Sequence, residues 1–287
     1  MEGIIYLNGK LVPAQEAKIS PFDRGLLYGY GLFETMRSYN EHVFRLDQHL
    51  ARLRRSAMVL ALASELEAYD LEQAIYKTLE ANHLKDARIR LTVSAGIGER
   101  GLAPPNLGPI TVMVSVEKLV LPPPQVYRRG IHAAIVSTRR NSLSPLSQIK
   151  ATNYLDSFVA LSQAVASGAE EAVLLNERGF IAECSTSNIF LVAEGILTTP
   201  SVESGILPGI TREAVLELAR DLGIETVERE IPEADLFQAE EAFLTTSVRE
   251  VVPITSVNGK PVGSGRPGTV TKRLMAAYKE LVEKTIT

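Results

Sequence analysis

The chain has 287 residues, of which 45% are hydrophobic and 22% charged, a composition that suits one large or two modest globular domains. Its net charge of −4 argues against a general nucleic-acid binder, because such proteins usually carry a basic excess. Cys184 is the only cysteine, which excludes an intrachain disulfide and a cysteine-built zinc site.

The first 120 residues predict a mixture of hairpins, helices and strands. Asn8-Gly9 between two short apolar runs is the strongest short-range hairpin signal, because both residues accept a positive φ. Two helices are expected from apolar residues at helical spacing behind an aspartate that can cap the first turn. The other elements expected here are a hairpin over 33–46, helices capped by Asp47 and Asp70, and strands over 87–95 and 110–120.

Three consecutive prolines in "LPPPQ", residues 121–125, mark the expected boundary between two halves. Proline cannot continue a central strand or a helix interior and favours an extended, stiff connection. We therefore predict an N-terminal α/β domain over 1–120, a linker over 121–130 and a C-terminal α/β domain over 131–287.

The second half also mixes strands and helices. Residues 171–200 are typical of an antiparallel meander with turns at "NERG" and "AEG". Both halves thus predict a mixed α/β (α+β) fold, and no GxGxxG follows a strand to indicate a dinucleotide-binding fold. The remaining expected elements are a strand over 131–137, a helix over about 154–168, a helix after "LPGITRE" that Gly223 caps, a hairpin at Asn258-Gly259 and a final helix over 269–284.

Lys150 and Glu183 are the first two candidates for chemistry. Lys150 stands among small and polar residues in "SQIKATNYLDS", at an expected strand-to-helix junction. Most lysines are solvated surface groups, but a lysine amine can also form a Schiff base with an aldehyde cofactor. Glu183 ends an apolar strand in "FIAECSTSN" and could stabilise a protonated heterocyclic nitrogen if it is buried, or could simply face solvent.

Two further places could bind a phosphate. "LPGITRE" puts Gly209, Ile210 and Thr211 at the open amino end of an amphipathic helix, where free N–H groups and the helix dipole attract anions. An ordinary helix start has the same pattern, and no Walker lysine indicates a nucleoside triphosphate. Arg52 could neutralise a phosphate with its planar fork of donors, or could be a solvated helix arginine.

Two loops carry side chains that could line a pocket for a carboxylate-bearing substrate. They are "YGYGLFETMR" and "GIGERGLAPP". The alternative is core packing for the aromatic residues and surface ion pairing for the arginines. The candidates are Tyr28, Phe33, Arg37, Arg90 and Arg100.

A lysine, an acid, a phosphate-binding helix start and an arginine together fit the chemistry of pyridoxal 5′-phosphate. The order of "GLFETMR", "HLARL", "IKATNYL", "AECSTSNIFLV", "LPGITRE" and "FLTTSVREVVPI" resembles the class IV, or fold-type IV, pyridoxal-phosphate aminotransferases from about residue 4 to about residue 280. The family includes branched-chain aminotransferases, D-amino acid aminotransferases and aminodeoxychorismate lyases. The resemblance implies two domains with the cofactor between them, in a homodimer or higher homo-oligomer whose partner chain enters the substrate pocket.

The resemblance also assigns roles. It makes Lys150 the catalytic lysine, which holds the cofactor and moves the substrate's α-proton. It places Tyr154 on the cofactor's 3′ oxygen, Glu183 on the pyridine nitrogen and Leu207 on the ring face. The implied phosphate contacts are Arg52, Ile210, Thr211 and Ser247, where Ser247 replaces the family's usual threonine, and Thr246 and Val248 join the substrate pocket.

The sequence is ambiguous about the substrate. "LPGITREAVLELARDLGIE" and "FLTTSVREVVPITSVNGK" look most like branched-chain enzymes, which favours transfer of an amino group from a branched-chain or other apolar L-amino acid to a 2-oxo acid such as 2-oxoglutarate. Arg88 stands where bacterial branched-chain enzymes often have an aromatic residue, and Arg100 is similar to the arginines in loops of the other two groups. D-amino acid aminotransferase, (R)-amine transaminase and aminodeoxychorismate lyase therefore remain open.

A different class of protein is the remaining alternative: a relative without useful catalysis, or a protein that holds another phosphate ligand. Intact Lys150, Tyr154 and Glu183 argue against it. We expect small-molecule partners and a cytoplasmic location, with neither nucleic acid nor membrane involved, because no signal peptide or long apolar span is evident. The four histidines lack ligand spacing, so we expect no histidine metal site.

Overall fold

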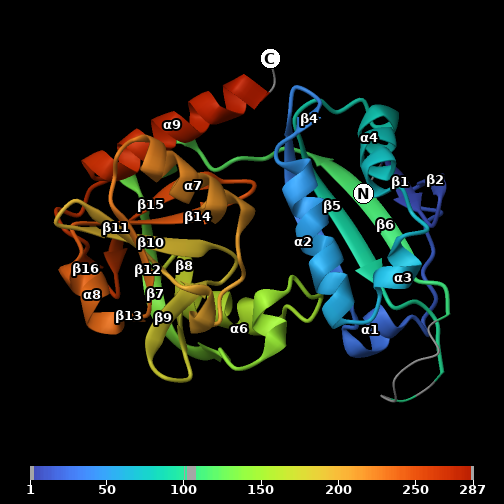
Figure 1. The fold of residues 1–287 in the computed structure, drawn as a ribbon, viewed down its shortest axis with the longest axis horizontal. Coiled ribbons are helices and arrows are strands. Elements are labelled where there is room, and N and C mark those ends of the chain that lie inside the picture. The colour runs from blue at the N-terminus through green and yellow to red at the C-terminus, as the bar shows by residue number, and fades with distance from the viewer. Residues whose placement is uncertain (1–2, 100, 102–107, 286–287) are drawn as a thin grey trace. The chain divides into compact units, whose positions relative to one another are not determined.

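The computed structural model describes residues 3–99, 101 and 108–285, and the structural statements below concern these residues. They divide into two compact units, each with its own sheet and apolar core (Figure 1). The first unit runs up to Val120 and adds the separate stretch Ile149–Asn153. The second comprises Leu121–Gln148 and Tyr154–Thr285. The mixed α/β fold class predicted from the sequence is confirmed.

The first unit is built on a six-stranded sheet in the order β2-β1-β6-β5-β3-β4, in which all neighbouring strands are antiparallel. Its strands are β1 (Ile4–Leu7), β2 (Lys10–Pro13), β3 (Gly31–Tyr39), β4 (His42–Val43), β5 (Ala87–Ser94) and β6 (Thr111–Lys118). Its helices are α1 (Arg24–Tyr28), α2 (Leu46–Val59), α3 (Ala63–Leu66) and α4 (Leu71–Ala81). Helices α2 and α4 close the apolar core against the sheet.

Strands β3 and β5 carry alternate side chains on opposite faces, as a period of two requires. Leu32 and Met36 of β3 and Ile89 and Leu91 of β5 are fully buried in the core that includes α2 and α4. The intervening residues of β3, beginning with Phe33, therefore project from the other face. This alternation decides which of the predicted site residues share a face.

The predicted turn at Asn8-Gly9 is confirmed. Both residues have positive φ, 48° and 90°, and the flanking Leu7 and Lys10 pair across the hairpin. Such a two-residue turn matches the twist of the strands it joins. The start of this hairpin is therefore set locally by its own turn residues.

The two aspartates predicted to cap helices behave differently. Asp70 caps α4 as predicted, since its carboxylate accepts a hydrogen bond from the backbone N–H of Gln73 at 2.9 Å. The prediction for Asp47 is wrong, because α2 begins one residue earlier, at Leu46. Arg45 ends the preceding hairpin in the left-handed conformation with φ 52°, which leaves Asp47 in the first turn. A negative charge there still favours the helix start.

The second unit contains a larger sheet in the order β12-β11-β10-β14-β15-β7-β8-β9-β13, with β16 paired to β15. Its strands are β7 (Ile131–Arg140), β8 (Glu171–Asn176), β9 (Phe180–Cys184), β10 (Asn188–Ala193), β11 (Ile196–Pro200), β12 (Thr226–Arg229), β13 (Ile231–Pro232), β14 (Glu241–Thr246), β15 (Glu250–Val257) and β16 (Lys260–Pro261). Its helices are α5 (Pro124–Arg129), α6 (Leu155–Ala166), α7 (Ile210–Asp221), α8 (Glu233–Gln238) and α9 (Thr269–Thr285), with short 3-10 helices η1 (Pro145–Gln148) and η2 (Val202–Ser204).

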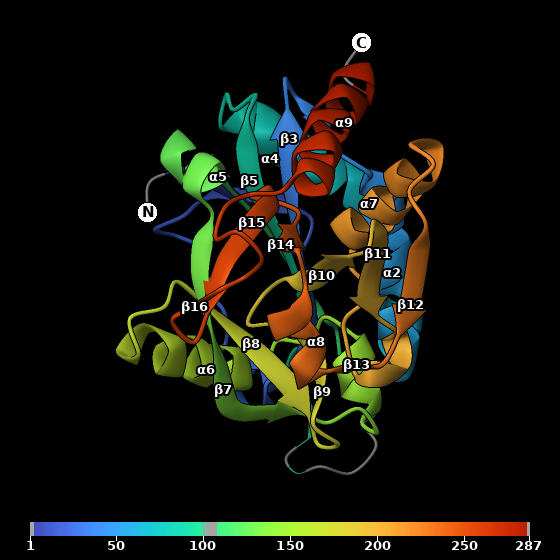
Figure 2. The ribbon, with the colours of Figure 1, turned by 90° about the vertical axis from the view of Figure 1, so that its left-hand side faces the viewer.

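Helices cover this sheet in two groups. Helix α6 packs on β7 and β8, where Ala160 and Ala164 meet Ala134 and Val136 in a small apolar cluster. Helices α7 and α9 contact each other and lie against β14, and α9 also contacts β15 (Figure 2). In the part of the chain that the structure describes, we find no helix long and apolar enough to cross a membrane.

The prediction of one meander over 171–200 is wrong. Strands β8 and β9 form one antiparallel pair and β10 and β11 form another, but β14, β15 and β7 stand with β8 between β10 and β9 in the sheet. The break follows from parallel pairing of β7 with β8 and with β15, which joins segments far apart in the chain. No local pattern reports such pairing.

Two boundary details also differ from expectation. The stretch predicted as a linker, 121–130, contains helix α5, whose first residue is Pro124. Proline fits the first helical turn because its missing N–H has no partner there anyway. Gly223 lies one residue beyond the C-cap of α7, which is Leu222, and its φ of 67° suits the turn that ends the helix.

Candidate functional site

Lys150 belongs to the first unit, where its backbone runs along the start of β3. The N–H of Phe33 donates to the carbonyl of Lys150 at 2.9 Å, and Ala151 forms an isolated antiparallel bridge with Leu32. The N–H of Thr152 donates to the carbonyl of Gly31, also at 2.9 Å. The stretch follows the 3-10 helix η1 instead of continuing a strand as expected, but it is held by hydrogen bonds on both sides of the lysine.

The side chain of Lys150 lies over an aromatic ring that a second cation also contacts. Lys150 Nζ is 4.5 Å from the centroid of the Phe33 ring, and the guanidinium carbon of Arg90 is 3.8 Å from it. Phe33 is buried in β3, and Arg90 lies on the adjacent strand β5, opposite Thr35. The structure thus brings three predicted residues, Lys150, Phe33 and Arg90, to one face of one sheet. Each cation gains a favourable contact with the ring face.

The other predicted substrate residues of this unit lie apart from that ring. The guanidinium carbon of Arg37 is 4.1 Å from the centroid of the Tyr39 ring. Tyr28 is the last residue of α1 and its side chain is exposed. Arg88, where an aromatic residue was expected, forms an ion pair with Glu117 across β5 and β6 at 3.4 Å. Arg100 lies outside the described residues.

Arg52, the predicted phosphate arginine, is buried in α2 beside Glu34 and His49. Its Nε and Nη2 atoms donate to the two oxygens of Glu34 at 2.8 and 2.6 Å. His49 Nδ1 lies 2.7 Å from Glu34 Oε2. His49 and Arg52 are three residues apart on α2, so both side chains point to the same face of the helix. Glu34 belongs to the set of β3 side chains that faces α2, which is why the carboxylate meets both of them.

Charge decides the protonation of this buried group. Burial by itself raises the pKa of Glu34, but the Arg52 charge and the His49 hydrogen bond outweigh it and lower the pKa to about 2. Burial lowers the pKa of His49, against the opposing pull of Glu34. The group therefore holds one carboxylate and one guanidinium around a neutral imidazole at neutral pH.

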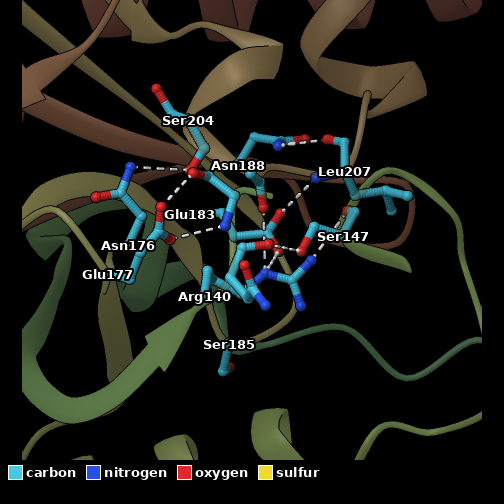
Figure 3. A network of polar contacts seen from close by, with 12 residues as sticks. Arg140, Ser147, Asn176, Glu177, Glu183, Ser185, Asn188, Ser204 and Leu207 are labelled. Atoms are coloured by element: carbon cyan, nitrogen blue, oxygen red, sulfur yellow. Dashed lines mark hydrogen bonds and ion pairs between the residues drawn. The ribbon is translucent and has the colours of Figure 1, made fainter. Parts of the chain in front are cut away.

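Glu183 lies in the second unit, near the end of β9, and both of its carboxylate oxygens are engaged (Figure 3). Arg140 Nε is 3.0 Å from Oε1, and the N–H of Leu207 donates to Oε2 at 3.0 Å. The carboxylate side chain is 12% exposed and that of Arg140 is 21% exposed. The predicted acid is thus a largely buried, ion-paired carboxylate, and not a solvent-facing strand residue.

The predicted phosphate cup at the start of α7 has the features of an open helix end. The N-cap is Gly209, so no side chain caps the first N–H groups, and Ile210 and Thr211 are buried. A Cβ atom on Gly209 would lie 2.0 Å from Asn188 Oδ1, so only glycine fits. Asn188 also donates from Nδ2 to the carbonyl of Leu207 at 2.9 Å, which holds the loop in front of the helix.

The turn between β14 and β15 carries the last group of predicted residues, Thr246, Ser247 and Val248. Thr246 Oγ1 accepts a hydrogen bond from the N–H of Arg249 at 2.8 Å, which closes the turn. Arg249 in turn forms an ion pair of 2.9 Å with the buried Glu171. Glu171 also accepts hydrogen bonds from the N–H and the hydroxyl of Ser185, so one carboxylate ties this turn to the segment that follows Glu183.

Tyr154, the predicted partner of the 3′ oxygen, is the N-cap residue of α6 and is half-buried. Four residues of these networks were missed by the sequence analysis: Glu34, His49, Arg140 and Glu171. His49 could have been found from its spacing to Arg52 on one helix face. The other three are charged residues within strands, and nothing local distinguishes them from surface charges until the strands pair.

Comparison with known proteins places the whole chain among related sequences. The family model described as amino-transferase class IV matches residues 31–257. A protein of Methanocaldococcus jannaschii provisionally named a branched-chain-amino-acid aminotransferase is 41% identical over 282 residues, covering 98% of this chain and 96% of that protein. An aminodeoxychorismate lyase of Bacillus subtilis is 33% identical over 285 residues, covering 99% of this chain and 96% of the lyase.

A solved structure matches both units. The branched-chain amino acid aminotransferase of T.th., in complex with N-(5′-phosphopyridoxyl)-L-glutamate, superimposes with a TM-score of 0.90 at 34% identity. The match covers 99% of this chain and 95% of that one. The likeness extends to the segments that hold Lys150, Glu183 and the start of α7.

Proposed function

Because the chain belongs to the class IV amino-transferase family, we propose that it is a pyridoxal-phosphate-dependent transaminase of branched-chain or other apolar L-amino acids. The amino acceptor in this proposal is a 2-oxo acid such as 2-oxoglutarate. The family predicted from the sequence motifs is confirmed by the match over residues 31–257. The names of the relatives that span nearly the whole chain support the choice of substrate.

The residues present fit pyridoxal 5′-phosphate. The uncapped start of α7, where Asn188 leaves no room for a side chain on Gly209, presents N–H groups suited to a phosphate. Glu183, ion-paired and largely buried, is an acceptor suited to a protonated ring nitrogen. Lys150 supplies the amine. The residues that we propose to hold the cofactor are Arg52, Lys150, Tyr154, Glu183, Leu207, Ile210, Thr211 and Ser247.

When bound, pyridoxal phosphate supplies an aldehyde for amine attachment and a ring that accepts electrons from the substrate. Lys150 would take the substrate's α-proton on Nζ and return it to the other side of the reaction. The ring of Phe33 would orient that amine, because Nζ already lies over its face. Glu183 would hold the proton of the ring nitrogen in place, which favours negative charge developing on the substrate.

The single observation that carries the proposal is the anchoring of Lys150. A lysine on a mobile surface loop would be a poor catalytic group, because productive geometry must be held within fractions of an ångström. Here the Lys150 carbonyl accepts a hydrogen bond from β3, the next residue bridges β3, and the amine rests over a buried ring. Such anchoring is what a covalent nucleophile requires.

A second candidate is aminodeoxychorismate lyase, which would use the same lysine on a different substrate. The observation that favours it is the Bacillus subtilis relative, which spans 99% of this chain. D-amino acid and (R)-amine transamination are further alternatives within the same family, and all of them share the residues above.

The near-visible absorption spectrum of the purified protein tests the proposal. We expect a yellow protein with bound pyridoxal phosphate whose colour is bleached by L-leucine and not by D-alanine. Lys150→Ala, checked for folding by circular dichroism, should lose the lysine-dependent band and turnover with L-leucine and 2-oxoglutarate. Bleaching by D-alanine alone would move the substrate to D-amino acids. A protein that stays colourless after addition of pyridoxal phosphate would count against the whole site.

We also propose that the protein is a homodimer or higher homo-oligomer and works in the cytoplasm. Three large apolar side chains of α6, Leu155, Phe158 and Val159, are exposed by 72%, 68% and 43%, a surface that a second copy would cover. The free, buried thiol of Cys184 suits a reducing compartment. Light scattering after gel filtration gives the mass in solution, and a monomer would contradict the first part.

A further inference from the structure

Arg140 connects three segments of the second unit, and each segment leads to a residue proposed to hold the cofactor (Figure 3). Its Nε contacts the carboxylate of Glu183 at 3.0 Å and donates to the carbonyl of Gly205 at 3.3 Å. Its Nη2 donates to the carbonyl of Ser147 at 2.9 Å. Gly205 precedes Leu207 by two residues, and Ser147 precedes Lys150 by three.

From this arrangement we infer that Arg140 is a positioning residue for recognition of the cofactor's ring nitrogen, acting through Glu183. The inference rests on the proposed function, because it requires Glu183 to be the partner of that nitrogen. It adds a residue and a mechanism: one guanidinium sets the direction of the carboxylate and holds the segments that precede Lys150 and Leu207.

The direction of the Glu183 carboxylate is determined by two donors, one on each oxygen. Arg140 contacts Oε1 and the Leu207 N–H donates to Oε2, so rotation of the carboxylate would break one or both contacts. A carboxylate has about four lone-pair sites, which leaves acceptor capacity for a third donor such as a ring N–H. Loss of Arg140 removes its contact with Oε1, which allows the carboxylate to turn about the contacts that remain.

The guanidinium is the group that suits this position. Its planar fork can contact Glu183, Gly205 and Ser147 at once, whereas an ammonium is a compact charge on a flexible stem. The position of Arg140 is itself fixed at the end of β7, where its carbonyl accepts a hydrogen bond from the N–H of Glu177 at 3.1 Å. The contacts therefore start from a rigid point of the sheet.

Arg139 provides a matched control in the same strand. It is exposed, and its guanidinium donates to the carbonyls of Val136 and Thr138 within β7. Replacing it removes the same charge from the adjacent position but leaves the contacts of Glu183 intact. A general effect of losing one arginine at the end of β7 would therefore appear in both variants.

The experiment compares two ligands of the cofactor-free full-length protein. One is pyridoxal 5′-phosphate, and the other is its 1-deaza analogue, in which a C–H group replaces the ring nitrogen. Dissociation constants are measured by equilibrium dialysis for the wild type, Arg140→Gln, Arg140→Lys, Arg139→Gln, Glu183→Gln and the double variant Arg140→Gln/Glu183→Gln. Circular dichroism and the thermal midpoint of each unliganded protein report whether it is folded.

We expect Arg140→Gln to weaken binding of pyridoxal 5′-phosphate by roughly tenfold or more, the scale typical of losing an outer partner of a ligand-binding group. Binding of the deaza analogue should change little, and Arg139→Gln should match the wild type with both ligands. Arg140→Lys should recover part of the loss. In the Glu183→Gln background, loss of Arg140 should add little, because the two residues act as one unit.

Two results would overturn the inference. If Arg140→Gln weakens both ligands equally, whether or not Glu183 is present, then Arg140 only supports the loops. If Glu183→Gln leaves the preference for the nitrogen-containing ligand unchanged, then Arg140 does not act through it. Failure of the proposed function looks different, because the wild-type protein itself would then bind neither ligand.

Discussion

Arg52 and Glu34 meet in the core of the first unit through two parallel hydrogen bonds, from Nε to Oε1 at 2.8 Å and from Nη2 to Oε2 at 2.6 Å. Fork-to-fork pairs of this kind fix both groups in one plane. Arg52 was expected to serve a phosphate, and the structure adds that its orientation is set by a carboxylate from the neighbouring strand. The pair is buried, so its loss has consequences for stability as well as for any ligand.

Replacement of Glu34 by glutamine should destabilise the protein strongly. The change leaves the buried Arg52 charge without its carboxylate, and breaking a buried pair in this way costs about 3–5 kcal/mol. The free energy of unfolding in urea measures the effect. Glu41→Gln is the matched control, because its pair with Lys85 is exposed and should be worth at most about 1 kcal/mol. Similar small losses in both variants would show that the Glu34 pair adds no stability.

The same group predicts a specific loss of stability in acid. The pKa of Glu34 is about 2 in the folded protein, against 4.5 as its ordinary value, so the unfolded state binds the proton first as the pH falls. The contribution is complete above pH 4.5, is lost as the pH falls toward 2, and amounts to roughly 3 kcal/mol. Burial lowers the pKa of His49 below 6.5, so it adds a loss that begins below that pH.

Urea unfolding at pH 6 and pH 3 checks this acid prediction. Other carboxylates titrate over the same range, so the informative quantity is the difference between the wild type and Glu34→Gln. That difference should shrink toward pH 3, because acid removes from the wild type what the substitution has already removed from the variant. A difference that is constant with pH would mean that Glu34 does not titrate as its buried contacts require.

Replacement of Gly209 by alanine should disturb the start of α7. The new Cβ would lie 2.0 Å from Asn188 Oδ1, so either the loop or Asn188 must move, at a cost of about 1–3 kcal/mol. We also expect weaker binding of pyridoxal 5′-phosphate, measured by equilibrium dialysis. Glu213→Ala, an exposed change in the same helix, should have little effect. The clash should cost less when Asn188 is alanine, and an equal cost in both backgrounds would contradict this explanation.

Cys184 should be unreactive in the native protein. Burial raises the pKa of its thiol well above the ordinary value, and the nearby Glu171 charge raises it further. The thiolate is the reactive form, so both its protonation and its lack of access oppose modification. Ellman's reagent should therefore label about one thiol per chain only after denaturation. Rapid labelling of the folded protein would show that the segment around β9 opens readily.

Local signals predicted the elements whose causes lie within a few residues. The Asn8-Gly9 turn, the Asp70 cap and the open helix start after Gly209 all depend on the conformational preferences of their own residues. Asp47 failed as a cap because Arg45 had already left the strand and begun the turn. Its error is one residue, which is typical of a helix end judged from side-chain type alone.

The candidate site divides in the same way. Lys150, Glu183 and the α7 start were found because each stands in a motif with a recognisable residue type and spacing. Arg140 and Glu34 were not, since their role depends on partners brought near by sheet pairing. The prediction of a single meander failed for the same reason, because a parallel pairing of β7 with β8 and β15 separates strands that are adjacent in the sequence.

The amino-acid sequence by itself determined the family, the mixed α/β class, the turns and caps, and the residue types available for chemistry. These follow from local conformational preferences and from the order of short motifs. Only the tertiary structure decided which charges meet: Glu34 with Arg52, 18 residues away, and Glu183 with Arg140 and with Leu207, 24 residues beyond it. The physical reason is that a buried charge must find a partner among residues that folding brings close, and distance along the chain does not report that choice.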